Sequence, residues 1–371
     1  MSIKIALVSN SSWSFYKFRK GIIKNLIDLG YEVILMSPKD EFINELLHLG
    51  TKFFELKKMS AKGINPINDI QCYLELKSIY NNIKPDIIFH YTIKPNIYGT
   101  YAAYKNKIKN IAVITGLGYT FLNKGIVSKV AIILYKFALN KANKIWFLNV
   151  DDKNIFIEKK IASIEKLHII KGEGIDCNYF MPRKYKETNS IKEVEFLFIG
   201  RLLLDKGIKE YYESAKLIRE KYPTVKCSIL GFLNSNNPQA IDSKEFQKWI
   251  DSGIINYYGS VNDVRTYLEN CSCVVLPSYR EGLSTVLLEA ASMCKPLIAS
   301  NIAGCKEVVD NKLTGFLVEP YSSKDLVDKM EKFFLLTDLE KKIMGEKGRE
   351  KIQKEFSIEN IYEEYKKAIK E

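Results

Sequence analysis

Residues 194–207 read VEFLFIGRLLLDKG, and this stretch shows how the chain is built. The mostly apolar run 194–199 has the length and composition of a strand buried in a sheet. A turn at Gly200 follows it, and a helix is expected to begin near Ile208. A buried strand that passes through a short loop into a helix is the repeating unit of a parallel sheet with helices on both faces.

Short apolar runs alternate with longer amphipathic stretches in the same way along the whole chain, and they predict two series of strands. The first series comprises residues 3–8, 32–36, 52–56, 86–90, 110–114, 144–148 and 167–170. The second series comprises residues 194–199, 225–230, 254–258, 273–276, 296–299 and 315–318. Between them, residues 172–192 are rich in Gly, Pro, Lys, Asn and Tyr without periodicity, as in a linker. We therefore expect an α/β protein with two doubly wound parallel sheets.

Length and composition support two domains. The chain has 371 residues, which is enough for two domains of ordinary size. Its 46% apolar and 27% charged residues are typical of a globular protein and argue against a collagen-like, coiled-coil or disordered chain. We expect one domain at 1–175, a second at 190–355 and a closing C-terminal helix at 356–371.

The cysteines and the apolar runs indicate the cellular compartment. The seven cysteines are odd in number and scattered through mostly apolar segments, which predicts reduced core thiols in a cytosolic protein. Because the chain has only three histidines, a structural zinc site is not expected. No apolar run approaches the roughly 18 residues that span a bilayer, so any membrane contact is expected to be peripheral.

Positive charge is unevenly distributed along the chain. The chain has 56 Lys and Arg residues against 44 Asp and Glu, a net charge of +12. Residues 1–172 hold 26 of these basic and 13 of these acidic residues, so the rest of the chain is nearly neutral. No acidic residue lies between Asp86 and Asp151, whereas nine lysines occur from Lys94 to Lys144. The first half is therefore expected to face an anionic partner.

Ligands of open parallel sheets bind beyond the carboxyl ends of the strands, so two such domains are expected to form a cleft between them. The loops at these ends lack the standard nucleotide fingerprints. There is no GxxxxGK[ST] sequence, and Gly116-Leu117-Gly118 is followed by Phe121 where a dinucleotide loop needs Gly or Ala. The sequence therefore favours neither an ATPase nor a dehydrogenase.

Two basic residues follow the strand at 194–199. Arg201 and Lys206 lie between this strand and the expected helix, whose positive N-terminal end favours anions. This arrangement is suited to holding a diphosphate through charge-assisted hydrogen bonds. The alternative is a solvated loop with one Arg–Asp pair.

Two carboxylates follow the strand at 273–276. Glu281 is expected at the strand mouth and Glu289 two turns into the next helix, about 12 Å further along its axis. At that separation they cannot share a proton, but they can hold the two ends of one elongated ligand by accepting hydrogen bonds from sugar and ribose hydroxyls. The backbone N–H groups expected to face an anion between them are those of Gly282, Leu283 and Ser284. The alternative is an exposed loop residue and an ordinary helix-face charge.

Taken together, these residues resemble a family pattern. Gly200-Arg201-x4-Lys206-Gly207 and Glu281-x7-Glu289 with Gly282 are similar to the large family of retaining, nucleotide-sugar-dependent glycosyltransferases with the GT-B fold. The resemblance covers essentially the whole chain. It implies two Rossmann-like domains facing each other across a cleft, a UDP-sugar donor bound mainly by the second domain, and no essential metal or other cofactor.

The resemblance also implies roles for individual residues. Arg201 and Lys206 are expected to neutralise the departing diphosphate, Glu281 to contact the donor sugar and Glu289 to hold the ribose. The expected catalytic residues are Arg201, Lys206 and Glu281. The expected donor-binding residues are Gly200, Arg201, Lys206, Glu281, Gly282, Leu283, Ser284 and Glu289.

A closer similarity is to bacterial enzymes that add the second sugar, often α1,3-linked N-acetylgalactosamine, to an amino sugar on undecaprenyl diphosphate. The similar segments are Ser14-Phe15-Tyr16-Lys17-Phe18-Arg19, Ile93-Lys94-Pro95-Asn96 and Thr115-Gly116-Leu117-Gly118. The acceptor-binding residues that this implies are Ser14, Lys17, Arg19, Lys94, Asn96, Gly116 and Gly118.

Many relatives have a His in the loop after the fifth strand, where this chain has Gly116-Leu117-Gly118. His90, at the end of the preceding strand, is therefore a possible site residue, although a lone His there is more often packed.

The resemblance implies retaining transfer of an N-acetylhexosamine, with α1,3-linked N-acetylgalactosamine as first choice, from a UDP-sugar to an undecaprenyl-diphosphate-linked amino sugar. Such a step belongs to the assembly of surface polysaccharides such as O-antigen, or of glycoprotein glycans. The alternatives are a transferase with a soluble acceptor and a nucleotide-sugar epimerase of the same fold. A nucleic-acid partner is not favoured, because its binding surface should carry a basic stripe beside exposed aromatic side chains.

Two basic segments of the first half suit a membrane-bound acceptor. Residues 123–143 alternate lysines with apolar side chains, which is typical of a helix at the inner surface of an anionic membrane. A core helix with its lysines outward fits the same pattern. Lys17, Arg19 and Lys20 are expected to meet the lipid diphosphate or to form a solvated basic face. We expect a cytoplasmic protein associated peripherally with the inner membrane.

Overall fold

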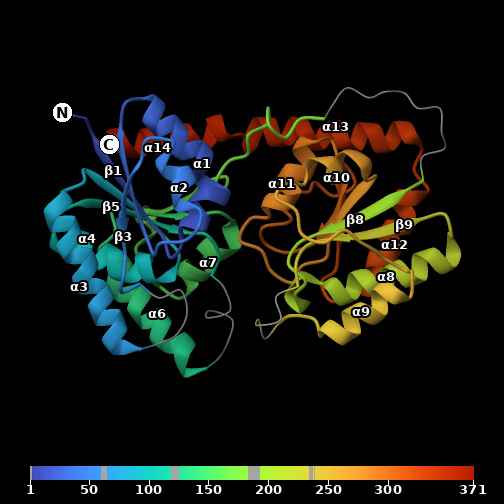
Figure 1. Cartoon of the computed structure of the whole chain (residues 1–371), viewed down its shortest axis with the longest axis horizontal. Coiled ribbons are helices and arrows are strands. Elements are labelled where there is room, and N and C mark those ends of the chain that lie inside the picture. The colour runs from blue at the N-terminus through green and yellow to red at the C-terminus, as the bar shows by residue number, and fades with distance from the viewer. Residues whose placement is uncertain (1, 60–64, 118–124, 183–192, 234–236, 238) are drawn as a thin grey trace. The chain divides into compact units, whose positions relative to one another are not determined.

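The computed structural model describes residues 2–59, 65–117, 125–182, 193–233, 237 and 239–371. The chain divides into two compact units (Figure 1). The first unit is Met1–Gly174 together with Ile358–Glu371, and the second is Ile175–Ser357. The chain therefore leaves the first unit at Gly174, builds the second, and returns to the first at Ile358.

The first unit is built on a seven-stranded parallel sheet. Its strands are β1 (Lys4–Val8), β2 (Glu32–Ser37), β3 (Lys52–Glu55), β4 (Ile87–Tyr91), β5 (Lys109–Ile114), β6 (Lys144–Phe147) and β7 (Leu167–Ile169). They lie in the order β3-β2-β1-β4-β5-β6-β7, and neighbouring strands are parallel. The helices of this unit are α1 (Ser12–Asp28), α2 (Ile43–Leu47), α3 (Pro66–Ile83), η1 (Pro95–Gly99), α4 (Thr100–Lys105), α6 (Ile126–Leu139), α7 (Val150–Glu158), η2 (Ile164–Lys166) and α14 (Ile358–Lys370).

One face of this sheet is covered by α3, α4 and α6. Ile88 of β4 belongs to the same buried cluster as Leu76 of α3 and Ala103 of α4. Phe147 of β6 belongs to a second buried cluster with Tyr135 of α6. The two clusters share a border, because the half-buried Tyr98 packs against both.

The opposite face is covered by α1 and α14. Tyr365 of α14 is fully buried, with its ring centroid 4.8 Å from that of Phe89 and 5.0 Å from that of Trp146. Phe15 of α1 packs edge-on against Tyr91. Because successive side chains of a strand point to opposite faces, these contacts place α1 and α14 across the sheet from α3 and α6.

The second unit is built on a six-stranded parallel sheet. Its strands are β8 (Glu195–Ile199), β9 (Lys226–Leu230), β10 (Asn256–Tyr257), β11 (Cys273–Leu276), β12 (Leu297–Ser300) and β13 (Gly315–Val318), in the order β10-β9-β8-β11-β12-β13. The helices are η3 (Leu204–Lys206), α8 (Ile208–Lys221), α9 (Ser243–Asp251), α10 (Arg265–Asn270), α11 (Thr285–Ser292), α12 (Ser323–Phe334) and α13 (Asp338–Glu355).

In both sheets the strand order reverses beside the first strand of the unit. In the first unit β1 lies between β2 and β4, and in the second unit β8 lies between β9 and β11. In doubly wound sheets, ligands bind outside the carboxyl ends of the strands at this switch point. The loops after β1 and β4, and those after β8 and β11, are therefore the places to look for a site.

The predicted fold class of two doubly wound parallel sheets is confirmed. Each predicted run overlaps a strand, and the helix expected near Ile208 begins at that residue. The largest difference lies in the predicted strand 254–258, of which only Asn256–Tyr257 pairs with a neighbour. All seven cysteines are free thiols, and six of them are buried. Within the described residues, no helix combines the length and apolar character that crossing a bilayer requires.

Candidate active site

Two loops of the second unit meet at its switch point. One follows β8 and contains Asp205 and Lys206, and the other follows β11 and contains Tyr279 and Glu281. The backbone N–H of Tyr279 donates a hydrogen bond to the carbonyl of Asp205 at 2.9 Å. The Tyr279 hydroxyl also donates to a carboxylate oxygen of Glu210 in α8, at 2.6 Å. Backbone and side chain together hold the two loops against each other.

An ion pair joins the predicted functional side chains of these loops. The Nζ atom of Lys206 lies 2.6 Å from Oε1 of Glu281, and the hydroxyl of Ser278 donates to the same oxygen at 2.7 Å. The Lys206 and Glu281 side chains are 17% and 12% exposed, so both charged groups are largely shielded from water. An ammonium group has three N–H donors, so Lys206 can hold Glu281 and still offer a donor to an anion.

Two glycines permit the close approach of the backbone around this pair. Gly207 has a φ of 71°, and a Cβ there would come 2.0 Å from the carbonyl oxygen of Pro277. Gly304 has a φ of 79°, and a Cβ there would come 2.8 Å from the backbone and the Cβ of Glu281. Neither position can take another residue without strain, because both need the left-handed backbone region and have no room for a side chain.

The second carboxylate, Glu289, lies in α11. It is the fifth residue of this helix and only 5% exposed. Ser284 is the N-cap of α11, since its hydroxyl accepts a hydrogen bond from the N–H of Leu287 at 3.4 Å. Glu289 is therefore about one turn into the helix, not two as the sequence predicted, because residues 281–284 precede the first helical turn.

One predicted anion contact is wrong. The backbone N–H of Ser284, which we expected to face the diphosphate, donates to the carbonyl of Gly304 at 3.1 Å. That bond fixes the start of α11 against the loop after β12 and leaves no hydrogen for an anion. Gly282 and Leu283 remain predicted contacts.

Arg201 is the exposed cation of the loop after β8. Its guanidinium makes no hydrogen bond or ion pair with any described residue, so the alternative of a loop closed by an Arg–Asp pair finds no support in this part of the chain. The preceding Gly200 is fixed by its N–H, which donates to the carbonyl of Leu230 at 3.0 Å. The backbone at the strand mouth is thus anchored, while the Arg201 side chain remains accessible.

In the first unit, hydroxyl groups gather where α1 begins. Ser11 is the N-cap of α1, and the hydroxyls of Ser9 and Ser14 lie 2.6 Å apart. The hydroxyl of Ser12 lies 2.8 Å from that of Ser37, which ends β2. Ser14, a predicted acceptor-binding residue, is only 6% exposed, so its hydroxyl serves the loop itself.

The prediction that Arg19 meets a lipid diphosphate is wrong. Its guanidinium is buried and forms an ion pair with Glu173. It also donates to the carbonyl of Ser14 at 3.0 Å and lies 3.8 Å from the ring centroid of Tyr91. Burial raises the pKa of the Glu173 carboxyl, and the Arg19 charge opposes that shift. Arg19 is therefore an internal link between α1 and the segment before Gly174, because its charge is already matched.

Lys94 and Asn96 are also used within the first unit. Lys94 forms an ion pair with Asp69 of α3 at 2.9 Å, with side chains 16% and 13% exposed. Asn96 is 1% exposed, and its side-chain amide donates to the carbonyl of Val113 in β5 at 3.0 Å. The burial of Asn96 contradicts its predicted role in acceptor binding, because its amide ties η1 to β5. Lys94, paired and shielded to about the same degree as Lys206, stays a prediction for acceptor binding.

His90 is a packed residue, which contradicts its possible place in the site. Its side chain is fully buried. Nε2 lies 3.0 Å from the hydroxyl of Tyr80, and Nδ1 lies 3.5 Å from that of Thr100. Burial lowers the pKa of His90 to about 3. A neutral imidazole with both nitrogens turned toward core hydroxyls cannot exchange a proton with a bound sugar.

The remaining predicted acceptor residues are less constrained. Lys17 is exposed on α1. Gly116 follows β5 with a φ of 140°, and it is half-buried. Gly118 lies outside the described residues. Lys17 and Gly116 stay predictions for acceptor binding.

The structure adds residues that the sequence analysis missed. Thr92, directly after β4, has a φ of 69°, which is rare for a β-branched residue. Its Oγ1 atom is buried and has no hydrogen-bond partner among the described residues. Backbone strain of this kind concentrates at functional sites, so Thr92 joins the acceptor-site candidates. The sequence gives no sign of this conformation at Thr92, because threonine seldom adopts it.

Ser278 and Gly304 were also missed. Only the fold brings these two residues to Glu281.

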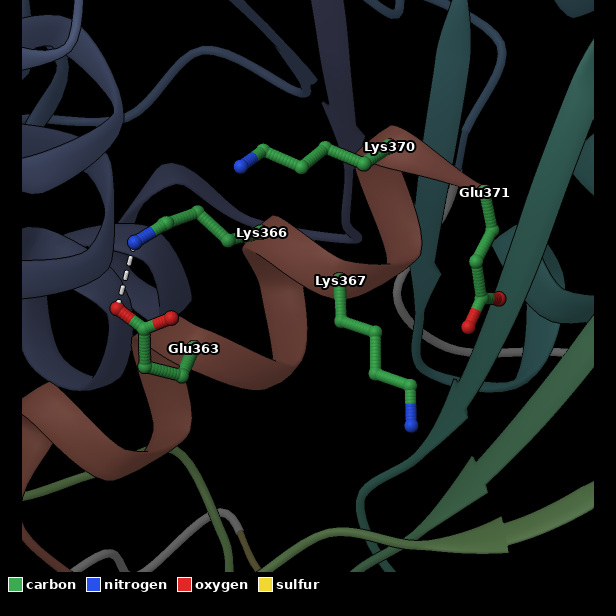
Figure 2. A pocket seen from close by; sticks show the side chains of 5 residues that line it. All are labelled: Glu363, Lys366, Lys367, Lys370 and Glu371. Atoms are coloured by element: carbon green, nitrogen blue, oxygen red, sulfur yellow. Dashed lines mark hydrogen bonds and ion pairs between the residues drawn. The ribbon is translucent and has the colours of Figure 1, made fainter.

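A surface hollow of about 470 Å³ lies elsewhere on the first unit. Figure 2 shows its lining side chains, which are Glu363, Lys366, Lys367, Lys370 and Glu371 at the end of α14. Glu371 forms an ion pair with Lys144, the first residue of β6. The hollow is therefore near the amino ends of the strands, on the opposite edge of the sheet from the switch-point loops, and it belongs to no predicted site.

The site in the second unit is suited to binding an anion that carries hydroxyl groups. It combines an exposed guanidinium, a shielded ammonium and a carboxylate that accepts hydrogen bonds. Among the described residues, no three His, Cys, Asp or Glu side chains gather closely enough to hold a metal ion. Arg201 and Lys206 are the predicted cationic groups of this site.

Comparisons with known proteins give the family. A family model described as glycosyl transferases group 1 matches residues 183–351, and one described as glycosyl transferase 4-like matches residues 4–149. The chain is 32% identical over 342 residues to an N,N'-diacetylbacillosaminyl-diphospho-undecaprenol α-1,3-N-acetylgalactosaminyltransferase of Campylobacter jejuni, covering 88% of each chain. It is 25% identical over 312 residues to a UDP-Gal:α-D-GlcNAc-diphosphoundecaprenol α-1,3-galactosyltransferase of Escherichia coli, covering 80% of this chain and 78% of that protein.

A solved structure agrees on the fold. HepE from Anabaena, crystallised in complex with UDP, superimposes with a TM-score of 0.81 over 100% of both chains at 16% identity. The group 1 model spans the second unit with Arg201, Lys206, Glu281 and Glu289, and the 4-like model spans β1 to β6 of the first. The chain is thus a glycosyltransferase of group 1, with the two Rossmann-like domains of the GT-B fold.

Proposed function

We propose that this glycosyltransferase moves an N-acetylhexosamine from a UDP-sugar to an amino sugar linked to undecaprenyl diphosphate, with retention of the anomeric configuration and without a metal. N-acetylgalactosamine in α1,3 linkage is the first choice of product. The relatives from Campylobacter and Escherichia coli support the acceptor class and the linkage, because both are named for α-1,3 transfer to diphosphoundecaprenol-linked sugars. The reaction would belong to polysaccharide or glycoprotein glycan assembly at the cytoplasmic membrane face.

The observation that carries the proposal is the ion pair between Lys206 and Glu281 beside the exposed Arg201. A cation and a carboxylate held 2.6 Å apart suit the junction of a sugar and its diphosphate. The Lys206 ammonium and the Arg201 guanidinium would bind the phosphate oxygens, while the Glu281 carboxylate accepts hydrogen bonds from sugar hydroxyls. Glu289, one turn along α11, is proposed to hold the ribose.

The proposed mechanism is a displacement on one face of the sugar. The bond from the anomeric carbon to the UDP oxygen breaks first, and its electron pair stays on the phosphate. The acceptor hydroxyl then attacks the anomeric carbon from the same side, and its proton passes to the departing phosphate oxygen. Arg201 and Lys206 would stabilise the negative charge that grows on UDP, an effect typically worth about 3–4 kcal/mol for each donor removed.

The test is a panel of UDP-sugars against acceptors linked to a short-chain polyprenyl diphosphate or to undecaprenyl diphosphate, read by release of UDP. Release with UDP-N-acetylgalactosamine only when a lipid-linked amino sugar is supplied supports the proposal. NMR of the product, with an α-anomeric coupling and a new linkage at the acceptor O3, checks stereochemistry and position. Unchanged turnover after prolonged EDTA treatment checks the absence of a metal.

Two other outcomes would redirect the assignment. UDP release with a free amino sugar as acceptor would favour a transferase with a soluble acceptor. Conversion of the UDP-sugar into its epimer, with no UDP released, would favour an epimerase. Hydrolysis of the UDP-sugar at one rate with and without acceptor would leave the acceptor assignment unsupported.

A further inference from the structure

Three neighbouring helices of the first unit form one continuous outer surface. Helices α3, α4 and α6 cover the same face of the sheet (Figure 1). Aromatic rings link them, since the ring centroid of Tyr101 in α4 lies 5.5 Å from that of Tyr73 in α3 and 4.8 Å from that of Phe137 in α6. We call this outer surface the α3–α4–α6 face.

This face carries two stripes of exposed apolar side chains. On α3, Ile67, Ile70 and Leu74 are 67%, 60% and 53% exposed. On α6, Val130, Ile133 and Phe137 are 44%, 64% and 54% exposed. Each stripe has the spacing i, i+3, i+7, which places its members on one side of a helix.

The inner sides of the same helices are apolar as well. Cys72, Leu76 and Tyr80 of α3 are buried against the sheet, as are Tyr135 and Ala138 of α6. A helix that packs on a sheet normally has a polar outer side. Contiguous apolar side chains on the outer side therefore indicate a surface that something covers.

The charges of the α3–α4–α6 face are positive. Lys129 and Lys136 of α6 are exposed on either side of Ile133 in the sequence. Lys105 and Lys141 hold their ammonium groups over the ring of Tyr104, at 5.9 Å and 4.9 Å from its centroid. Helices α4 and α6 contain no acidic residue.

The acidic residues of α3 are already engaged. Asp69 pairs with Lys94, and Glu75 accepts hydrogen bonds from the backbone N–H groups of Lys57 and Lys58. Two copies of this face pressed together would oppose lysine to lysine without carboxylates between them. An anionic bilayer, in contrast, offers phosphates to the lysines and a headgroup–acyl boundary to the apolar stripes.

We infer that the α3–α4–α6 face is the membrane-docking surface of the protein and that it binds an anionic lipid leaflet. The stripes on α3 and α6 enter the boundary between headgroups and acyl chains, and the lysines contact lipid phosphates. Tyr104 of α4 is 44% exposed, and its ring suits the membrane interface. This inference rests on the proposed function, since a lipid-linked acceptor requires the enzyme to work at a bilayer.

Vesicle flotation tests the inference with the full-length protein. The probe is phosphatidylethanolamine vesicles with phosphatidylglycerol, compared with phosphatidylcholine vesicles, at low and high salt. The wild type is expected to float with the anionic vesicles at low salt and to be released by high salt. The double variant Ile67→Asn/Ile133→Asn removes one exposed aliphatic side chain from each stripe, and the double variant Lys129→Glu/Lys136→Glu reverses two charges. Each is expected to lower vesicle binding by about tenfold or more.

Matched controls lie in the second unit. Leu335 and Leu339 are 64% and 65% exposed, so Leu335→Asn/Leu339→Asn removes the same kind of side chain from another surface. This variant is expected to bind vesicles as the wild type does. Wild-type protein that stays unbound at low salt would overturn the inference, as would vesicle binding unchanged in both variants of the face. Self-association of the wild type that both variants abolish, without vesicle binding, would also overturn it and assign the face to a second copy.

Turnover separates this inference from the proposed function. With a short-chain, water-soluble acceptor, both variants of the face are expected to release UDP at the wild-type rate. With the acceptor embedded in vesicles, they are expected to lose activity in proportion to vesicle binding. Vesicle binding that depends on the face, together with no UDP release from any lipid-linked acceptor, would leave docking standing and reject the proposed function.

Discussion

The two sheets share one strand order but use charge in opposite ways at their switch points. In the second unit, Arg201 is exposed at the strand mouth, and Lys206 is held to Glu281 in a neighbouring loop. In the first unit, Arg19 is buried against Glu173, and Lys94 is paired with Asp69. An arginine that follows a strand end is thus exposed in one unit and buried in an internal ion pair in the other, so nearness to a strand end does not by itself identify a site.

The largest expected effect is a loss of stability when the buried Arg19–Glu173 ion pair of the first unit is broken. Arg19→Met leaves the buried Glu173 carboxylate without its cation, which typically costs about 3–5 kcal/mol of stability. Urea unfolding in a Trp249→Phe background measures it, because the other two tryptophans, Trp13 and Trp146, lie in the first unit.

The controls for this prediction are an exposed pair and a double variant. Lys52→Met removes the partner of Glu32 at the surface and should cost less than about 1 kcal/mol. Arg19→Met/Glu173→Met should recover most of the stability, since no uncompensated charge remains buried. A loss after Arg19→Met as small as that after Lys52→Met would show that the pair is not a structural link.

The second prediction concerns turnover and not stability. Arg201→Ala should lower kcat by about 100- to 1,000-fold with the melting temperature unchanged, because the exposed guanidinium supports no contact within the described fold. UDP release and thermal unfolding measure the two quantities. Lys209→Ala, on the exposed side of α8 beside Glu245, is the matched control and should keep wild-type turnover. Near-normal turnover of Arg201→Ala would remove the diphosphate role from this residue.

The third prediction tests the backbone behind Glu281. Gly304→Ala should cost about 1–2 kcal/mol for the left-handed backbone. It should also lower kcat/KM, because the new Cβ would press on Glu281 at 2.8 Å. Gly259→Ala is matched in conformation, with a φ of 74°, but nothing lies within 4 Å of its Cβ position. It should therefore lose only the stability that the left-handed backbone accounts for, and keep its turnover. Equal turnover in the two variants would show that Glu281 is not held by this contact.

The smallest effect concerns pH and the buried His90. Burial lowers the pKa of His90 to about 3, so the native state stays neutral at pH values where an unfolded His takes a proton. The unfolded state then binds more protons, and stability falls as the pH drops below about 6.5. Between pH 7 and 5.5 the loss from His90 should be about 1 kcal/mol. Urea unfolding at both pH values measures this loss. Between pH 7 and pH 5.5, the free energy of unfolding should fall by about 1 kcal/mol less in His90→Gln than in the wild type. An equal fall in both proteins would contradict a neutral buried His90.

Sequence patterns were sufficient for the fold because the strands are buried on both faces. Runs such as 5–8 and 273–276 are apolar without interruption, and a parallel sheet covered on both faces requires such runs. The short strand Asn256–Tyr257 is the exception, since it lies at a sheet edge and has a single neighbour. The apolar run 254–258 therefore predicted a longer strand than the two residues that pair with β9.

The candidate site was predictable only in part. Glu281 and Lys206 were identified by their loops, but their ion pair depends on β8 and β11 being neighbours, which the sequence does not state. Arg19 was misassigned because its partner, Glu173, is 154 positions away in the chain. Asn96 was misassigned for a similar reason, since its amide meets a carbonyl of another strand. Sequence proximity to a strand end indicates where a side chain starts, but only the packing shows what it meets.

The return of the chain to the first unit has a consequence for its biosynthesis. Helix α14 follows the whole second unit in the sequence, yet its Tyr365 is fully buried against Phe89 and Trp146 of the first sheet. Helix α14 is therefore the last element to be synthesised, at about 5–20 residues per second, and it leaves the ribosome after the second unit. The first unit therefore completes its fold only after the last residues emerge, and until then the part of its sheet around Phe89 and Trp146 lacks the helix that covers it.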